Sequence, residues 1–411
     1  MKKKKILISS FDLAIGGVER SLIGLLNQLD YSRFDVDLLL FRHEGEFMPL
    51  LPSGPNLLAE IPQYATFRQS IKEIVKSGHA SIGLSRLIAR YVGTVQGKLT
   101  RSAEPGYRVI QYGWKYSLPF LPEMKEEYDV AISFLWPHYF IGDKVRAKQK
   151  LGWVHTDYSN IQINQALEQQ MWEQLDQVVA VSEECRQSFL KVMPSLRAKT
   201  MVIENIISPA FVREQALAEV AEGMSQIAGR VKLLTVGRLS FAKGIDQAAY
   251  ACRKLVDQGI DVEWTIVGYG PLQAEIEEII ENLNLRDHFK LVGKKTNPYP
   301  YMRACDIYVQ PSRYEGKAVT VREAQILGKP VLITHFPTAP SQVQDGLDGL
   351  ITPMGVDGIV VGVKKLLEDN DLRKKLAANA QRRDYSNNDQ VEKLYSLIES
   401  NEGKISKAAD R

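Results

Sequence analysis

The sequence contains few cysteines and no long hydrophobic run. Three cysteines, Cys185, Cys252 and Cys305, occur among 411 residues, too few and too widely spaced for a disulfide framework or a zinc site. We therefore expect reduced, buried thiols and a cytoplasmic protein. No stretch of about 18 apolar residues is present that could span a membrane. The apolar run after the basic start ends at Asp12, which predicts a first β-strand and not a signal peptide.

The net charge is also small, +3 at pH 7, but the basic residues are unevenly distributed. Between Thr66 and Phe120, nine lysines and arginines stand against two glutamates, together with aromatic residues such as Tyr91 and Trp114. This mixture predicts peripheral contact with an anionic membrane surface. Nucleic acid is a rival partner that we do not expect. A solvated helical face with an irregular insertion is the alternative that needs no partner.

The length suggests two domains, because 411 residues exceed what one hydrophobic core usually serves. Both halves repeat a short β-branched run, a loop and a longer amphipathic stretch. This pattern predicts an α/β fold with two Rossmann-like, doubly wound parallel-sheet domains facing across a cleft. The predicted strands are 5–10, 36–41, 129–134, 150–155, 177–182, 232–237, 263–268, 289–293, 307–312 and 330–334. We place the domains at 1–207 and 208–388, followed by 389–411, a helix expected to cross back to the first domain and then a disordered tail.

The first loop with a candidate binding role is SSFDLAIGGVERSL. Ligands bind at the carboxyl ends of strands in such sheets, and this loop follows the first predicted strand. Gly16 and Gly17 precede a helix that continues through Leu26. Paired glycines let the backbone approach an anion, and the helix start favours phosphate. The spacing is not GxGxxG, so a nicotinamide site is not predicted, and a plain tight turn is the alternative.

The second loop, TVGRLSFAKGID, carries two cations just after a predicted strand, Arg238 and Lys243. A guanidinium fork and an ammonium at one strand end fit a diphosphate best. The alternative is a pair of unrelated surface cations.

The third loop, EGKAVTVREAQILGKPV, places Glu315 and Glu323 eight positions apart. Gly328 and Pro330 predict the end of a helix over 319–327. A carboxylate accepts two hydroxyl hydrogen bonds, so one glutamate can hold ribose hydroxyls and the other the sugar of a sugar nucleotide. A hydrolase that uses one carboxyl as acid and the other as nucleophile is the competing interpretation.

This third loop resembles the E-x7-E signature of retaining glycosyltransferases of family 4, the group 1 glycosyltransferases, which have the GT-B architecture. The other loops occur in that family's order: GGVER, GRLSFAKG, VGYGPLQAE, LVGKKTNPYPYMRACDIYVQPS and EGKAVTVREAQILGKPVLIT. The resemblance covers nearly the whole chain and is weakest from about Gly45 to Glu127. One E-x7-E occurs easily by chance, whereas five loops in order are specific.

The resemblance implies roles for individual residues. It implies that Glu323 binds the donor ribose, that Glu315 lies near the donor sugar, and that Arg238 and Lys243 neutralise the diphosphate. Further residues expected to bind the nucleotide sugar are Gly16, Gly17, Gly268, Tyr269, Leu272, Leu291, Gly293, Lys317, Ala318 and Val319.

Two other features bear on the expected chemistry. The family typically uses no metal, and the DxD of the first half, Asp35 and Asp37, begins an N-terminal strand without a site context. No cofactor is expected besides the donor. The chain departs from the family at Lys317 and Ala318, where an aromatic and a glycine often follow the EG pair. Lys317 is a candidate to contact the donor phosphate or a carboxylated sugar, although a solvated lysine is the interpretation we favour.

Two histidines of the first half, His138 and His155, follow predicted strands and compete for a place near the reacting centre. In the family a histidine of the first domain commonly contacts the donor sugar. We prefer His155, with Asp157 as the acceptor-side residue beside it. A satisfied polar group at a strand end is the alternative for each histidine.

The resemblance implies a metal-independent, retaining glycosyltransferase. It would transfer a sugar from a nucleotide-diphosphate sugar, expected to be a UDP-sugar, to a hydroxyl of a membrane- or lipid-linked glycan in bacterial surface polysaccharide assembly. The residues expected to act in catalysis are Glu315, Arg238, Lys243, His155 and Asp157. Two alternatives stay open: a sugar-nucleotide epimerase or phosphorylase on the same architecture, and a non-catalytic sugar-nucleotide-binding subunit.

Overall fold

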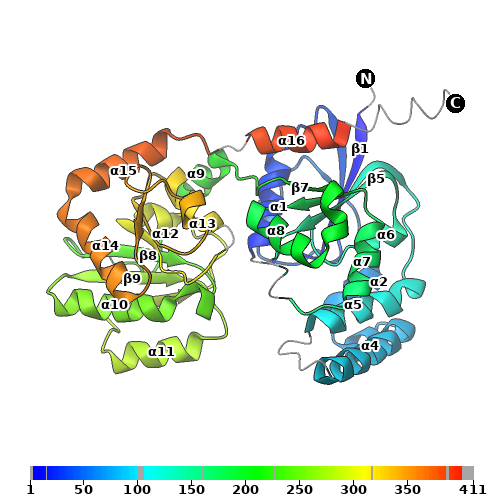
Figure 1. Cartoon of the computed structure of the whole chain (residues 1–411), viewed down its shortest axis with the longest axis horizontal. Helices are drawn as coiled ribbons and strands as arrows, with labels where there is room; N and C mark the ends of the chain where they lie inside the picture. The colour runs from blue at the N-terminus through cyan, green and yellow to red at the C-terminus, as the bar shows by residue number, and fades with distance from the viewer. Residues whose placement is uncertain are drawn as a thin grey trace. The chain divides into compact units, whose positions relative to one another are not determined.

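The protein divides into two compact units (Figure 1). The computed structural model describes residues 3–14, 16–99, 106–156, 158, 161–225, 227–315, 318–385 and 388–399. Unit 1 comprises Met1–Ile207 and Asn387–Arg411, and unit 2 comprises Ser208–Ser386. Each unit contains one parallel sheet whose strands are connected through helices. The predicted class, two Rossmann-like parallel-sheet domains, is confirmed.

The sheet of unit 1 has seven strands in the order β3-β2-β1-β4-β5-β6-β7. Central strands are buried on both faces; Ile6, Leu7 and Ile8 of β1 are each fully buried, which explains their continuous apolar run. The order reverses between β1 and β4. The strand bounds are β1 Lys4–Ser10, β2 Phe34–Leu40, β3 Asn56–Leu57, β4 Glu127–Ser133, β5 Arg146–Val154, β6 Gln177–Ala180 and β7 Thr200–Val202.

The helices of unit 1 include one from the far end of the chain. Tyr395 of that helix, α16, accepts a hydrogen bond from the Asp30 amide at 2.8 Å, and its ring lies 5.1 Å from that of Phe34. The helices are α1 Gly17–Gln28, α2 Pro62–Ala65, α3 Ile71–Lys76, α4 Ala80–Leu99, α5 Gly106–Ser117, α6 Tyr139–Lys144, α7 Gln165–Glu173, α8 Glu183–Val192 and α16 Asn388–Glu399.

The sheet of unit 2 has six strands in the order β10-β9-β8-β11-β12-β13, with the reversal between β8 and β11. Its core is built around Trp264 and the apolar faces of α10 and α14. The strands are β8 Val231–Val236, β9 Val262–Val267, β10 Phe289–Gly293, β11 Ile307–Gln310, β12 Val331–Thr334 and β13 Leu350–Thr352. The helices are α9 Pro209–Ala218, α10 Ile245–Asp257, α11 Gln273–Asn282, α12 Tyr299–Ala304, α13 Val319–Ile326, α14 Val356–Glu368 and α15 Asn370–Arg382.

Several smaller expectations can be compared with the structure. All ten predicted strands are present, whereas β3, β7 and β13 were not predicted. The three cysteines are buried thiols and not disulfides, and burial raises the pKa of Cys252 and of Cys305 to about 12. Within the described ranges, no helix is both long and apolar enough to cross a membrane. The expected disordered tail, residues 401–411, lies outside the described residues.

Candidate functional site

The candidate site lies at the strand ends of unit 2 where the strand order reverses. β8 and β11 are hydrogen-bonded neighbours there. Arg238 and Lys243 follow β8, and Glu315 follows β11. Open α/β sheets bind ligands at the carboxyl ends of the strands at such a point. The topology therefore brings three predicted site residues from two distant sequence segments to one edge of the sheet.

Lys243 and Glu315 form an ion pair. Lys243 Nζ lies 2.5 Å from Glu315 Oε1, and the two side chains are 24% and 9% exposed. The same carboxylate oxygen accepts hydrogen bonds from Ser312 Oγ at 2.7 Å and from Gln310 Nε2 at 3.0 Å. Thr338 Oγ1 donates to the Glu315 backbone carbonyl at 2.9 Å. Glu315 is therefore oriented by four neighbours, and it fixes the position of the Lys243 ammonium.

Arg238 is the second cation of this edge. Its side chain is exposed and forms no hydrogen bond or ion pair with the part of the chain that the structure describes. The aliphatic part of the Lys243 side chain lies close to Gly237, the residue before Arg238. A Cβ added at Gly237 would lie 3.6 Å from Lys243 Cδ. The guanidinium of Arg238 is thus available to an anionic ligand beside a lysine that is already positioned.

The loop after β8 is docked on the loop after β11. Gly244 has φ +65°, and a Cβ there would lie 2.1 Å from the Pro311 carbonyl oxygen. The Arg313 amide donates to the Ala242 carbonyl at 2.8 Å, and the Arg313 guanidinium makes two hydrogen bonds to the Asp246 carboxylate, at 2.8 and 2.5 Å. Only glycine allows this approach, and the bidentate pair fastens it.

Glu323 lies on α13 and is almost fully buried, with 1% of its surface exposed. Tyr299 of α12 donates its hydroxyl to Glu323 Oε1 at 2.8 Å. The two glutamates thus sit on different elements, Glu315 before α13 and Glu323 within it. The ribose-binding role of Glu323 stays a prediction.

Three of the residues predicted to line the nucleotide, Gly268, Tyr269 and Leu272, follow β9, and their segment contacts the loop after β8. Gly268 has φ +156°, and a Cβ there would lie 1.9 Å from the Gly237 carbonyl oxygen. The Leu239 amide donates to the Tyr269 carbonyl at 3.0 Å, and the Leu272 amide donates back to the Leu239 carbonyl at 3.2 Å. Tyr269 itself is half exposed. These loops form a second fastened pair at the same edge.

The remaining predicted residues of unit 2 belong to β10 and to the start of α13. Leu291 and Gly293 are partly buried in β10, and the Gly293 carbonyl accepts a hydrogen bond from the Gly268 amide at 2.9 Å. Ala318 is buried just before Val319, the first residue of α13. Two other predicted residues, Lys317 and Asp157, lie outside the described residues.

In unit 1, Gly16 is the N-cap residue of α1 and Gly17 its first residue. Gly16 has an extended backbone and caps the helix without a side-chain hydrogen bond. Burial, followed by the nearby Asp12 carboxylate, raises the pKa of Glu19 in the first turn. Arg68 Nε lies 3.0 Å from Asp12 Oδ2, a contact that the sequence pattern did not indicate.

The two histidines differ in depth. His138 is fully buried; its Nδ1 lies 2.7 Å from Ser133 Oγ, its ring lies 4.3 Å from that of Trp172, and burial lowers its pKa to about 3. His155 follows β5, is partly exposed, and packs 4.8 Å from the Phe134 ring. Burial of its ring nitrogens lowers its pKa to about 4. Both are neutral at pH 7, and His155 is the one nearer to solvent.

Sequence reasoning missed a buried carboxylate in the same unit. Glu168 of α7 is fully buried, which raises its pKa, and its Oε1 accepts hydrogen bonds from Tyr158 at 2.7 Å, Trp172 at 2.8 Å and Trp136 at 3.0 Å. Gln111 Nε2 donates to Oε2 at 2.6 Å. The network ties together the segments after β4 and β5 that carry His138 and His155. Its members are spread along the sequence without a motif, so no pattern signals it.

The two aspartates of the DxD at 35–37 differ in burial and in hydrogen bonding. Asp37 of β2 is buried and accepts hydrogen bonds from Tyr128 Oη at 2.9 Å and Asn56 Nδ2 at 2.7 Å, while Asp35 is exposed. These contacts join β2 to its neighbour β3 and, across β1, to β4. Among the described residues, no group of three or more histidine, cysteine, aspartate or glutamate side chains is placed to hold a metal ion.

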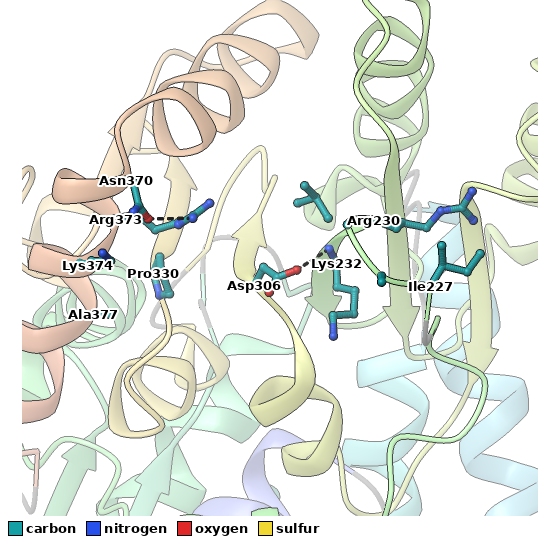
Figure 2. Close-up of a pocket in the computed structure, with 12 residues that line it drawn as sticks. Ile227, Arg230, Lys232, Asp306, Pro330, Asn370, Arg373, Lys374 and Ala377 are labelled. Atoms are coloured by element: carbon teal, nitrogen blue, oxygen red, sulfur yellow. Dashed lines mark hydrogen bonds between the residues drawn. The ribbon is translucent and has the colours of Figure 1, made fainter.

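A pocket of about 640 Å³ lies at the opposite edge of the unit 2 sheet. Its lining includes Arg230, Asp306 and Pro330, which precede β8, β11 and β12. Figure 2 shows the Lys232 amide donating to Asp306 there, at 2.8 Å. The pocket is therefore at the amino ends of the strands, away from the loops that carry Arg238, Lys243 and Glu315.

Comparison with solved structures defines the fold class. The chain aligns with the structure of Anabaena Alr3699/HepE in complex with UDP and glucose over 97% of its length and 100% of that chain, with a TM-score of 0.65 and 19% identity. A glycosyltransferase from Rickettsia africae aligns over 98% of this chain and 100% of that one, with a TM-score of 0.66 and 17% identity. Together with the two parallel sheets, these likenesses show that the fold is GT-B.

Sequence comparison then identifies the family of unit 2. Residues 225–383 match the family model "Glycosyl transferases group 1", so this unit contains a group 1 glycosyltransferase domain. The chain is 28% identical over 151 residues to alpha-D-kanosaminyltransferase of Streptomyces kanamyceticus, covering 36% of this chain and 39% of that protein. It is 35% identical over 133 residues to the amylovoran biosynthesis glycosyltransferase AmsK of Erwinia amylovora, covering 30% and 33%. These alignments span little more than a third of the relatives' length.

Proposed function

We propose that this protein transfers a sugar from a nucleotide-diphosphate sugar, a UDP-sugar, to a hydroxyl of a glycan acceptor. The observation that carries the proposal is the placement of Arg238, Lys243 and Glu315 on adjoining strand ends within the group 1 domain. A relative in fold was crystallised with UDP and glucose, which supports a nucleotide-sugar donor.

We further propose that transfer retains the anomeric configuration and needs no metal ion. As the diphosphate leaves, its growing negative charge is met by Arg238 and by Lys243, which Glu315 already holds in place. The Lys243 ammonium has three donors, so pairing with Glu315 leaves others for a phosphate oxygen. The acceptor attacks from the face that the diphosphate leaves, and a donor phosphate oxygen takes its proton. His155, neutral at pH 7, orients a hydroxyl of the donor sugar or acceptor.

The acceptor we propose is a membrane- or lipid-linked glycan, in the cytoplasmic assembly of a bacterial surface polysaccharide. The relative AmsK, named for amylovoran biosynthesis, supports this class of product. We propose that unit 1 binds the acceptor, and in this unit Glu168 holds the segments after β4 and β5.

The test begins with a thermal unfolding screen against UDP-, GDP- and ADP-sugars. A donor that binds only the folded state raises the unfolding temperature. We expect UDP-sugars to do so, and transfer to occur only with an added acceptor. Arg238→Ala should slow transfer by about 10²–10³-fold, the usual loss when one preorganised hydrogen-bond donor is removed. The unfolding temperature of the variant without donor should equal that of the wild type. Arg303→Ala, an exposed cation on α12, is the matched control and should be silent.

Three results would contradict the proposal. Product formed without an acceptor indicates an epimerase or phosphorylase. Donor binding without turnover under any acceptor indicates a non-catalytic subunit. Equal rates in the wild type and Arg238→Ala show that the strand-end cations do not act on the diphosphate.

A further inference from the structure

Helix α4 packs against α5 through a face that contains its small residues. Ser85, Ala89 and Gly93 are buried, and Ser85 Oγ lies 3.1 Å from Ser117 Oγ of α5. A Cβ added at Gly93 would lie 2.8 Å from Val109 Cγ2, so α4 and α5 are in close backbone contact. Figure 1 shows α4 at the outer edge of unit 1, beyond α5. The small-residue face is therefore the packing face of this helix.

The opposite face of α4 carries large apolar side chains that face solvent. Their exposed fractions are 59%, 50%, 47%, 72% and 38% for Leu84, Leu87, Ile88, Tyr91 and Val95, which we call the α4 stripe. Spacings of three, four and seven residues put all five on one side of the helix. An amphipathic helix in a soluble domain normally turns such a stripe inward. A contiguous exposed apolar patch of this kind marks an interaction surface.

The helices α3 and α4 also carry an excess of positive charge. Residues 66–99 contain six lysines and arginines and a single acidic residue, Glu73. Arg86 is turned inward, where it donates to the Thr66 carbonyl at 3.2 Å. Three cations are exposed and form no ion pair or hydrogen bond with any described residue: Lys72, Lys76 and Arg90. The surface thus combines an apolar stripe with unneutralised charge of one sign.

We propose that the α4 stripe docks unit 1 onto an anionic lipid bilayer. The apolar side chains enter the boundary between headgroups and acyl chains, while Lys76 and Arg90 meet the anionic headgroups. A helix of 20 residues is about 30 Å long, so the whole stripe can lie in the interface plane. A second copy of this chain is a poorer occupant, because two stripes placed face to face would bring unpaired cations of the same sign together.

This docking goes beyond the proposed glycosyl transfer and is independent of it. The α4 stripe belongs to unit 1, whereas Arg238, Lys243 and Glu315 belong to unit 2. Membrane binding can therefore be measured without donor or acceptor. The proposal also assigns the membrane contact expected of Thr66–Phe120 to one face of α4 and to the exposed cations of α3 and α4.

The experiment is flotation of the full chain with vesicles of phosphatidylcholine alone, or of phosphatidylcholine mixed with phosphatidylglycerol. We expect binding to the mixed vesicles, weakened by salt, and little binding to the neutral ones. Leu87→Glu combined with Tyr91→Glu should reduce binding at least about tenfold, because charged groups replace the buried apolar area. Leu217→Glu combined with Val361→Glu, at residues 69% and 61% exposed on unit 2, is the matched control and should bind as the wild type.

A second pair of variants tests the charges without touching the stripe. Lys76→Ala combined with Arg90→Ala should weaken binding to the anionic vesicles about 30-fold. Lys365→Ala combined with Arg382→Ala, exposed cations of unit 2, should have no effect. The proposal is overturned if the wild type does not float with anionic vesicles, or if control and stripe variants lose binding equally. It is also overturned if the stripe variants change the oligomeric mass in solution while vesicle binding stays intact.

Discussion

Lys243 and Glu315 lie 72 positions apart and hold each other at the candidate site. Glu315 also receives hydrogen bonds from Ser312 and Gln310, so its carboxylate stays satisfied when the lysine turns part of its donor capacity to a ligand. A carboxylate on a side chain that is only 9% exposed would destabilise the folded protein without such hydrogen-bond partners. Glu315 therefore both positions the Lys243 ammonium and balances its charge. The role of either residue is best measured by comparing the two single variants with the double variant.

His138 gives a prediction about pH at the scale of one residue. Its pKa in the folded protein is lowered to about 3 by burial, compared with about 6.5 in an unfolded chain. Between these values the unfolded chain binds a proton that the folded protein does not, so the free energy of unfolding falls as pH falls below about 6.5. The contribution of this histidine to the slope should be small at pH 7 and approach about 1.4 kcal/mol per pH unit near pH 5, measured by urea unfolding across this range.

The matched variants isolate this contribution from other titrating groups. His138→Gln should remove that part of the slope, even where it lowers stability at pH 7 by disturbing the contact with Ser133. His335→Gln replaces an exposed histidine of unit 2 and should leave the slope as in the wild type. An unchanged slope in His138→Gln would show that the ring is solvated and titrates normally in the folded protein.

At the scale of elements, Gly244 is the point where the loop after β8 meets the loop after β11. Alanine there would combine a positive φ with a Cβ 2.1 Å from the Pro311 carbonyl oxygen. Gly259, at the end of α10, also has a positive φ, but a Cβ there meets nothing within 4 Å. Gly259→Ala should lower stability by about 1 kcal/mol through backbone strain alone. Gly244→Ala should lose about 1–3 kcal/mol more through the clash, measured by chemical unfolding.

The two glycine variants also separate stability from ligand binding. Gly244→Ala should weaken donor binding, because moving this loop shifts the adjacent Lys243 away from Glu315. Gly259→Ala should leave donor binding intact. Equal donor affinities in both variants would mean that the docking of the two loops does not position the lysine.

The same elements show how far sequence reasoning reaches. Ten strands could be predicted because they are buried on both faces and leave continuous apolar runs. The strands that were missed, β3, β7 and β13, have two or three residues and lie at sheet edges, too short for any periodic signal. Helix α4 differs from these strands: its apolar period is clear, yet five of its large apolar side chains are exposed, while Ser85, Ala89 and Gly93 are buried together with Ile82.

For the candidate site, the sequence located the loops but not their contacts. Arg238, Lys243 and Glu315 follow predicted strands, so their common edge follows from parallel topology. The direct pairing of Lys243 with Glu315 requires that β8 and β11 are neighbours in the sheet. The sequence of neither loop indicates this strand order. The buried network around Glu168 joins residues from four separate segments, so nothing local distinguishes its members.

At the scale of the whole molecule, the chain passes from unit 1 to unit 2 and returns. The divisions fall after Ile207 and after Ser386, and the last described helix, α16, belongs to unit 1. Val391, Leu394 and Ile398 on one side of α16 are buried. The stability of unit 1 therefore depends on a segment that is synthesised only after the whole of unit 2.

Tyr395 is the residue through which this dependence can be measured. It is 4% exposed, its ring lies 5.1 Å from that of Phe34, and its hydroxyl bridges the Asp30 amide at 2.8 Å and the Gln28 carbonyl at 3.2 Å. Tyr395→Ala should destabilise unit 1 by about 3–5 kcal/mol through lost packing. Tyr395→Phe keeps the ring and should lose only about 1 kcal/mol with the hydrogen bonds.

Hydrogen exchange resolves the effect by unit, because amides report local opening. In Tyr395→Ala the amides of β1 and α1 should exchange faster, while those of β8 and β9 keep the wild-type rates. Tyr250→Ala, which truncates a 45% exposed tyrosine on α10 of unit 2, is the control and should leave both sets unchanged. Faster exchange in β8 and β9 as well would mean that the two units unfold cooperatively, because Tyr395 contacts Gln28, Asp30 and Phe34, which all belong to unit 1.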